Sequence, residues 1–120
     1  MLPKHHRLTR SKDFTRVRRR GRSAGNPLLA VHVLPVRSAE IRIGFSVSKK
    51  VGKAVLRNRV KRRMREVIRQ QLPTMRPGQD VVVVARPPAA DATFRELEGA
   101  IHSALQRTGS VQRTAEATHA

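Results

Sequence analysis

The chain lacks several residue types on which common protein chemistries depend. Its 120 residues include no cysteine, tryptophan or tyrosine, and only three phenylalanines. Without cysteine there can be no disulfides and no thiolate metal sites. The near absence of aromatic side chains argues against a single-strand binder that stacks bases, such as an RRM or OB domain.

Acidic residues are also few, and they are scattered. The sequence holds eight Asp and Glu, and no two of them share a predicted face beside a histidine, as general acid–base catalysis would require. His5 and His6 have no third fixed ligand for a metal, and residues 50–53 lack the spacing of a phosphate-binding loop. We therefore predict no catalytic residue and no metal site on the protein.

Long apolar runs are absent as well. No stretch approaches the ~20 apolar residues that a membrane span needs. The charged N-terminus is not followed by the apolar segment of a secretory signal. The expected location is the cytoplasm.

Positive charge is what the chain has in excess. Lys and Arg number 26, and the formal net charge is +18. Residues 1–22 hold nine of these cations and one acid, and residues 49–69 hold ten and one acid. Two basic segments on one domain predict a surface for a polyanion, with nucleic acid as the leading candidate. An anionic membrane is the competitor, but the basic segments lack the Trp, Phe and Leu face of membrane-surface helices.

The second basic segment also carries a helical apolar pattern. Its apolar residues recur on one side of a helix: Leu56, Val60, Met64 and Val67. We predict a helix over residues 54–71, ended by Pro73. A merely solvated face would mix Glu with Lys, whereas Glu66 is the single acid here, so the pattern favours binding over solvation.

Apolar patterns and turn residues predict the remaining elements. We expect a short helix over 12–19 capped by Ser11, a loop over 21–27, strands over 28–36, 41–48 and 80–86, and a helix from the capping box Thr93–Glu96 to Gly109. The strand over 80–86 does not alternate, so it should be covered on both faces. A basic arm (1–10) and a disordered tail (110–120) flank one domain, which ends at residue 109. The order is helix, two or three strands, helix, strand, helix, an α+β fold.

Strand 41–48 should leave one face of the sheet open. Isoleucine, phenylalanine and valine alternate with small or polar residues, which include Ser46 and Ser48. If His32 of the preceding strand lies on the same side, it joins the serines on a shallow polar platform. Phe14, on the short helix, either anchors that helix to the sheet or lines a groove beside it.

The segment GFSVSKKVGKAVLRNRVKRRMRE (44–66), with Arg57-Asn58-Arg59 at its centre, resembles the signature of the bacterial ribonuclease P protein subunit. Residues 8–21 are similar to that family's first helix, residues 25–35 to its first strand, and residues 80–87 with the capped helix to its C-terminal half. The resemblance covers about residues 4–107. It implies a fold of the ribosomal protein S5 domain 2 type with a left-handed crossover through the basic helix, where a right-handed one would be the default.

The resemblance also implies a function. The enzyme would be a tRNA 5′-processing endoribonuclease, a ribonucleoprotein that removes the 5′ leader of precursor tRNA. Its large RNA would perform the hydrolysis with Mg²⁺ held by RNA, and no obligate protein partner is expected. Residues implied to bind the catalytic RNA are Lys53, Arg57, Asn58, Arg59, Lys61, Arg62, Arg65 and Arg69. Residues implied to form the leader-binding cleft are Phe14, Arg18, His32, Ser46, Ser48, Lys49 and Lys50.

Two positions depart from the family pattern. Arg18 stands where members often have a second aromatic residue, and His32 stands where they often have tyrosine. Leader contact should therefore depend more on charge and less on stacking. Two other functions stay open at this stage: a structural ribosomal-RNA-binding or assembly protein of similar fold, and a sequence-blind DNA binder.

Overall fold

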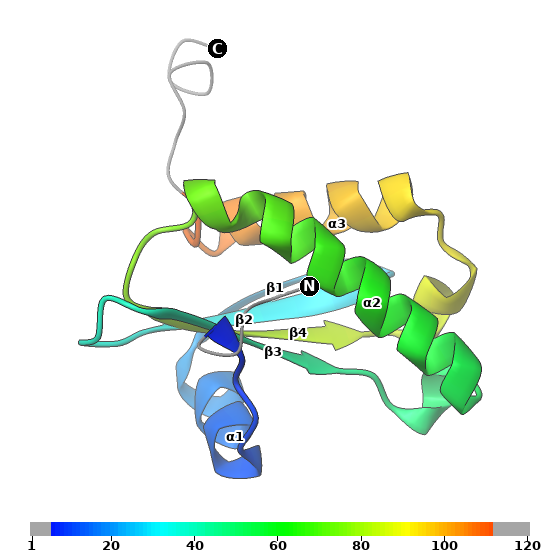
Figure 1. Ribbon diagram of the computed structural model, residues 1–120, viewed down its shortest axis with the longest axis horizontal. Coiled ribbons are helices and arrows are strands. Elements are labelled where there is room, and N and C mark those ends of the chain that lie inside the picture. The colour runs from blue at the N-terminus through cyan, green and yellow to red at the C-terminus, as the bar shows by residue number, and fades with distance from the viewer. Residues whose placement is uncertain (1–5, 112–120) are drawn as a thin grey trace, which may run out of the picture.

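The computed structural model describes residues 6–111 as a four-stranded sheet with helices on both faces (Figure 1). Helices α2 and α3 lie on one face and α1 lies on the other. The elements are α1 Ser11–Arg20, β1 Arg22–Gly25, β2 Leu29–Pro35, β3 Ile41–Ser46, η2 Lys49–Val51, α2 Ala54–Gln71, η3 Leu72–Thr74, β4 Gln79–Ala85, η4 Pro87–Asp91 and α3 Phe94–Arg107. The predicted α+β class is confirmed, and the optional third strand before α2 is present.

The sheet has the strand order β1-β2-β4-β3. β2 is antiparallel to β1 and β4, and β3 is parallel to β4, so α2 forms the crossover that a parallel pair requires. β4 lies between β2 and β3, and every residue except the half-buried Val84 is buried. The prediction that residues 80–86 form a strand covered on both faces is confirmed.

The main core lies between the sheet and the two helices α2 and α3. Helix α2 has the predicted bounds and turns its apolar side inward, with Val60, Met64, Val67 and Ile68 buried. They pack with buried side chains of the sheet and of α3: Leu29, Val31, Ile43, Val81, Val83, Leu97, Ile101 and Leu105. No helix within residues 6–111 is long and apolar enough to cross a bilayer.

Both predicted ends of α3 are confirmed. The Thr93 hydroxyl accepts a hydrogen bond from the Glu96 amide at 3.1 Å, and the Glu96 carboxylate accepts one from the Thr93 amide at 2.8 Å, which is a capping box. After the helix, Gly109 adopts a φ of +74°, and the Ser110 amide donates to the Leu105 carbonyl at 2.9 Å. A left-handed residue at this place favours glycine because it has no Cβ.

A second, smaller apolar cluster holds α1 against the other face of the sheet. Leu8, Val17 and Val82 are buried there, and the half-buried Phe14 packs beside them. The Phe14 ring lies directly over Gly44 of β3, where an added Cβ would lie 2.8 Å from the ring atom Cε2. The anchoring role considered for Phe14 is therefore present in the structure.

A buried carboxylate also ties α1 to the sheet. Asp80 of β4 has no exposed surface, and both of its oxygens accept hydrogen bonds from Arg42 of β3, at 3.0 and 2.9 Å. Arg16 of α1 donates to the same carboxylate at 2.8 Å and to Asp13 at 3.1 Å. The hydrogen bond with Asp80 raises the pKa of Arg42. A buried charge requires such partners, so these contacts fix the position of α1 over β3 and β4.

Several predicted boundaries were wrong. The segment predicted as a loop over residues 21–27 contains β1, which pairs with β2 residue by residue. The amide oxygen of Asn26 accepts hydrogen bonds from the Leu28 and Leu29 amides and closes this hairpin. Helix α1 begins one residue early, because Arg10 and not Ser11 is its N-cap residue, without a side-chain cap. The strand expected over 41–48 ends at Ser46, because Ser48 caps η2 by accepting a hydrogen bond from the Lys50 amide.

The two flanking segments enter the fold further than predicted. Of the predicted basic arm, Arg7 forms a parallel bridge with Ile43, and the Leu8 amide donates to the Ile43 carbonyl at 2.8 Å. Of the predicted tail, Ser110 and Val111 are buried, and Val111 bridges Met75. Residues 1–5 of the arm and 112–120 of the tail lie outside the described residues.

Candidate nucleic-acid interface

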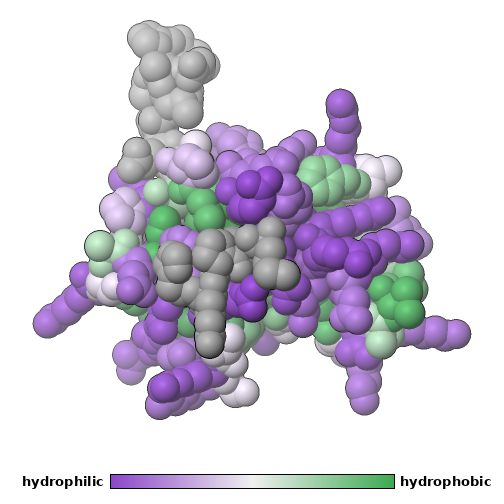
Figure 2. Space-filling view, in the orientation of Figure 1, coloured by the Kyte–Doolittle hydropathy of each residue, from purple (hydrophilic) through white to green (hydrophobic). Residues whose placement is uncertain are grey.

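The outward side of α2 carries a row of basic residues. Arg57, Lys61 and Arg65 recur every four residues, so they lie above one another on the helix. Asn58 and Arg62, next to this row, are exposed. Figure 2 shows hydrophilic side chains gathered over α2 in this view. A rigid helix thus presents several cations with fixed spacing.

Arg69, the last member of the predicted set, differs from the others. It forms a two-point ion pair with Glu66, at 2.6 and 3.0 Å. The hydrogen bond between them raises the pKa of Arg69 and lowers the pKa of Glu66. Because its charge is offset within the helix, Arg69 is the predicted cation least suited to an external anion.

The guanidinium groups of three α2 arginines differ in their hydrogen bonds to the domain. Arg57 donates to the Gly52 carbonyl at 3.2 Å, and Arg63 donates to the Ala92 carbonyl at 3.0 Å. The buried Nε of Arg59 has no hydrogen-bond partner within residues 6–111. Arg63 is thus tied to the core side of the helix, which agrees with its absence from the predicted set.

The approach to α2 adds three exposed lysines. Lys49 and Lys50 belong to η2, and Lys53 is the N-cap residue of α2, where the helix dipole also attracts anions. Ser48 precedes them and is exposed, but its hydroxyl already accepts a hydrogen bond from the Lys50 amide. Ser48 is therefore not part of the open strand face on which it was predicted.

Four of the predicted cleft residues belong to the α1 side of the sheet. His32 of β2 and Gly44 of β3 both pair with Val82 of the central strand, and Ser46 pairs with Val84, two residues further along. His32 and Ser46 therefore flank β4 on the face that α1 partly covers, with Phe14 packed over Gly44. Arg18 is close enough to His32 to act on its charge.

The surroundings of His32 disfavour the protonated, charged form of its imidazole ring. Burial, then the charges of Arg18 and Arg86, lower the pKa of His32 below its ordinary value of 6.5. Its Nδ1 is buried and has no hydrogen-bond partner in the described part of the chain. At neutral pH this histidine is therefore uncharged, and its Nδ1 is shielded from solvent.

The His32 environment predicts a measurable titration. An NMR titration of the free protein should give a His32 midpoint below 6.5, and Arg18→Ala should raise it in part, because burial is the larger cause. Since the folded state holds His32 neutral, its contribution to stability is complete above about pH 6.5 and is lost as the pH falls below that value. Arg95→Ala, on α3, should leave the midpoint unchanged. A midpoint at or above 6.5 would contradict the assignment.

A pocket connects the α2 row to the α1 side of the sheet. It has a volume of about 230 Å³ and lies across the edge strand β3. Lys61 and Arg65 of α2, Phe14 of α1 and Phe45 of β3 all line it. The remaining lining residues are Arg7, Leu8, Thr9 and Ile43. The two groups predicted separately, the basic helix and the cleft, thus meet along β3.

Three residues of this region were not predicted as site residues. Arg7 and Thr9 come from the segment predicted as a basic arm, and Arg86 influences His32 from just after β4. The positive charge of residues 1–22 was the available signal, but its position depends on the pairing of Arg7 with β3. Within residues 6–111, no three His, Asp or Glu side chains are grouped to hold a metal ion.

Comparison with known proteins gives consistent similarities. The family model for Ribonuclease P matches residues 2–109. The Ribonuclease P protein component of Streptomyces avermitilis is 47% identical over 116 residues, covering 89% of this chain and 94% of that protein. That of Clostridioides difficile is 40% identical over 102 residues, covering 84% and 90%. The solved structure of the Staphylococcus aureus RNase P protein aligns with a TM-score of 0.83 at 32% identity, covering 91% of this chain and all (100%) of that one.

Proposed function

Because this chain belongs to the ribonuclease P protein family, whose members are subunits of the enzyme that matures the 5′ ends of tRNA, we propose how its two surfaces divide the work. The basic side of α2 contacts the catalytic RNA, and the cleft between α1 and the sheet holds the 5′ leader of precursor tRNA. The observation that carries this proposal is their junction along β3, where Lys61, Arg65 and Phe14 line one pocket.

The α2 surface suits an RNA backbone. Contacts with phosphates need cations on a rigid mount, and arginine forms two-point hydrogen bonds with phosphate oxygens. Arg62 and Arg65 make no ion pair within residues 6–111, so their charges are available for a partner. Lys53, Arg57, Asn58 and Lys61 extend the same surface toward the start of the helix.

The cleft suits a single strand. Phe14 offers the edge of an aromatic ring, His32 offers a half-buried uncharged imidazole ring, and Arg18 supplies charge beside them. Single-stranded RNA is bound by such a combination of stacking and cations. Lys49 and Lys50 follow Ser46, the last residue of β3. They would contact the RNA leader where it leaves the cleft toward α2.

The hydrolysis itself is assigned to the RNA subunit. Mg²⁺ is the expected metal ion. The described residues offer no group of His, Asp and Glu to hold it, and we propose that the RNA subunit binds it. The protein binds the leader, orients it beside the RNA active centre and supplies cations that reduce the Mg²⁺ requirement of the RNA.

A reconstitution tests the proposed function directly. Adding the protein to a ribonuclease P RNA at a limiting Mg²⁺ concentration should increase the rate of leader removal, because its cations replace part of the counterions that the RNA needs. The measurement is release of the leader from end-labelled precursor. At saturating Mg²⁺ the stimulation should become smaller but should not disappear, because the contribution from leader binding does not depend on replacing counterions. No stimulation at any Mg²⁺ concentration would overturn the assignment of both surfaces.

Phe14→Ala tests the cleft. Affinity of the holoenzyme for precursor should fall roughly tenfold while affinity for mature tRNA stays unchanged, because base stacking contributes about 1–3 kcal/mol. The same change removes the packing of the ring on Gly44, so unfolding is measured in parallel. Phe14→Leu is the matched control: it retains most of the packing and removes the stacking. Reduced stability of Phe14→Ala with its affinities for precursor and for mature tRNA both unchanged would leave Phe14 as an anchor only.

A further inference from the structure

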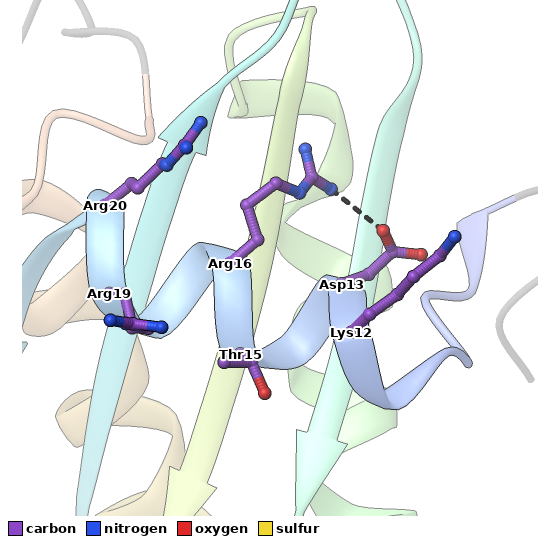
Figure 3. A pocket seen from close by; sticks show the side chains of 6 residues that line it. All are labelled: Lys12, Asp13, Thr15, Arg16, Arg19 and Arg20. Carbon is purple, nitrogen blue, oxygen red and sulfur yellow. Dashed lines mark hydrogen bonds and ion pairs between the residues drawn. The ribbon is translucent and has the colours of Figure 1, made fainter.

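The outer face of α1, turned away from the sheet, carries basic residues that the proposed function does not use. Figure 3 looks onto this face, with the strands behind the helix. The side chains border a hollow of about 710 Å³ and are spread along the helix: Lys12, Asp13, Thr15, Arg16, Arg19 and Arg20. None of them belongs to the leader-binding cleft or to α2.

Not all of these charges are available to a partner. Arg16 is committed to Asp13 and Asp80, which offset its charge. Lys12, Arg19 and Arg20 are exposed and form no ion pair within residues 6–111. The hollow therefore presents three cations whose charge the described part of the protein does not balance.

Helix stability explains only part of this arrangement. Arg19 and Arg20 occupy the last turn of α1, where cations interact favourably with the helix dipole. Lys12 lies in the first turn, where the same dipole disfavours a cation. A row of cations that runs the whole length of the helix, including its unfavourable end, points to an external anion.

The shape of the row favours the backbone of an RNA helix over a single strand. Single-strand binding relies on aromatic side chains, but the only aromatic residue of α1, Phe14, faces Gly44 on the other side. Lys12 and Arg19 are separated along α1 by about 10 Å at 1.5 Å per residue. One strand of a nucleic-acid duplex places roughly three phosphates in that length, at about 3.4 Å of axis per phosphate.

Resting on the function proposed above, we propose that the outer face of α1 binds the sugar–phosphate backbone of a helical segment of the catalytic RNA, separate from the segment that α2 contacts. Figure 1 shows α1 and α2 on opposite faces of the sheet, so the protein lies between two RNA segments. A leader strand in the cleft would have to turn around a helix about 10 Å thick to reach this face, which makes the leader a poor occupant.

Directed cleavage of the RNA tests the placement. The chain has no cysteine, so Thr15→Cys in the α1 hollow and Gln70→Cys on α2 each create the only thiol for a tethered iron-EDTA group. In the holoenzyme with precursor tRNA, the two probes should cut two separate helical segments of the catalytic RNA. A Thr15→Cys probe that cuts only the precursor, or nothing, while the Gln70→Cys probe cuts the catalytic RNA would overturn this inference alone. If neither probe cuts the catalytic RNA, the proposed function fails and the inference fails with it.

Salt dependence tests the energetics. Lys12→Gln should lower the slope of log affinity against log salt for the catalytic RNA by about 0.7–0.9, and Arg19→Gln/Arg20→Gln by about twice as much. Lys12→Gln should not destabilise the helix, because it removes a cation from the unfavourable end of the dipole, so a fall in affinity cannot be attributed to unfolding. The matched control is Arg37→Gln/Arg95→Gln, at two exposed positions away from α1. Slopes equal to those of this control would overturn the inference.

Discussion

Changing Asp80 to asparagine should lower the free energy of unfolding by about 3 kcal/mol, because removing one partner from a buried ion pair leaves the others without their acceptor. Asp80 is fully buried and receives three hydrogen bonds, two from Arg42 and one from Arg16. Asparagine has nearly the same shape but no charge, and its amide group would face the guanidinium donors. Both arginines retain about a third of their side-chain surface in water, which keeps the effect at the lower end for buried pairs.

Urea unfolding measures this change in stability, and Asp91→Asn, at an exposed position in η4, is the control, with a change within about 0.5 kcal/mol. Amide hydrogen exchange shows where the fold loosens. Protection should fall first in α1, which Asp80 ties to the sheet, and later in α3, which has its own caps. Wild-type stability in Asp80→Asn would mean that the apolar cluster around Val17 alone holds α1.

Changing Arg62 and Arg65 together to alanine should weaken binding of the catalytic RNA by about 10²–10⁴-fold, taking about 1.5–3 kcal/mol for each charge-assisted hydrogen bond. The slope of log affinity against log salt should fall by about one unit for each phosphate that the variant no longer binds. Arg62 is exposed and Arg65 lines the pocket beside β3, so neither supports the core, and the unfolding free energy should change little.

The double variant Arg37→Ala/Arg95→Ala removes the same net charge from positions outside both proposed surfaces. It separates a general weakening of electrostatic attraction from the removal of defined phosphate-binding groups. If both double variants bind the catalytic RNA equally and with the same salt slope, Arg62 and Arg65 only face solvent. Filter binding at several salt concentrations gives both quantities from one series.

The sequence predicts those parts of the fold that local pattern determines. Helix α2 and the capped helix α3 have strong periodicity and clear end signals, and both are found where expected. Strand β1 was missed because Arg22–Gly25 have little β propensity, and their strand depends on pairing with β2. Leu8 and Val111 were assigned to flanking segments because a short sequence segment does not show that another part of the chain will bury it.

The candidate site was predictable to a similar degree. The helical spacing of 57–65 places the basic row, but Arg69 cannot be separated from it until its ion pair with Glu66 is seen. The tether between Asp80, Arg16 and Arg42 joins residues far apart in the sequence, on a helix and two strands. Such contacts follow from strand register, which no periodicity in this chain specifies.

The glycine beneath Phe14 determines how closely α1 approaches β3 at the proposed leader-binding cleft. Gly44 lets the ring rest on the β3 backbone, and a methyl group there would lift the helix or displace the ring. A larger side chain at one of the positions 14 and 44 therefore leaves less space for the side chain at the other. A relative with alanine or serine at position 44 should carry a smaller residue at position 14, or hold its first helix farther from the sheet. Covariation between these two positions across the family would thus indicate how the width of the proposed leader-binding cleft varies.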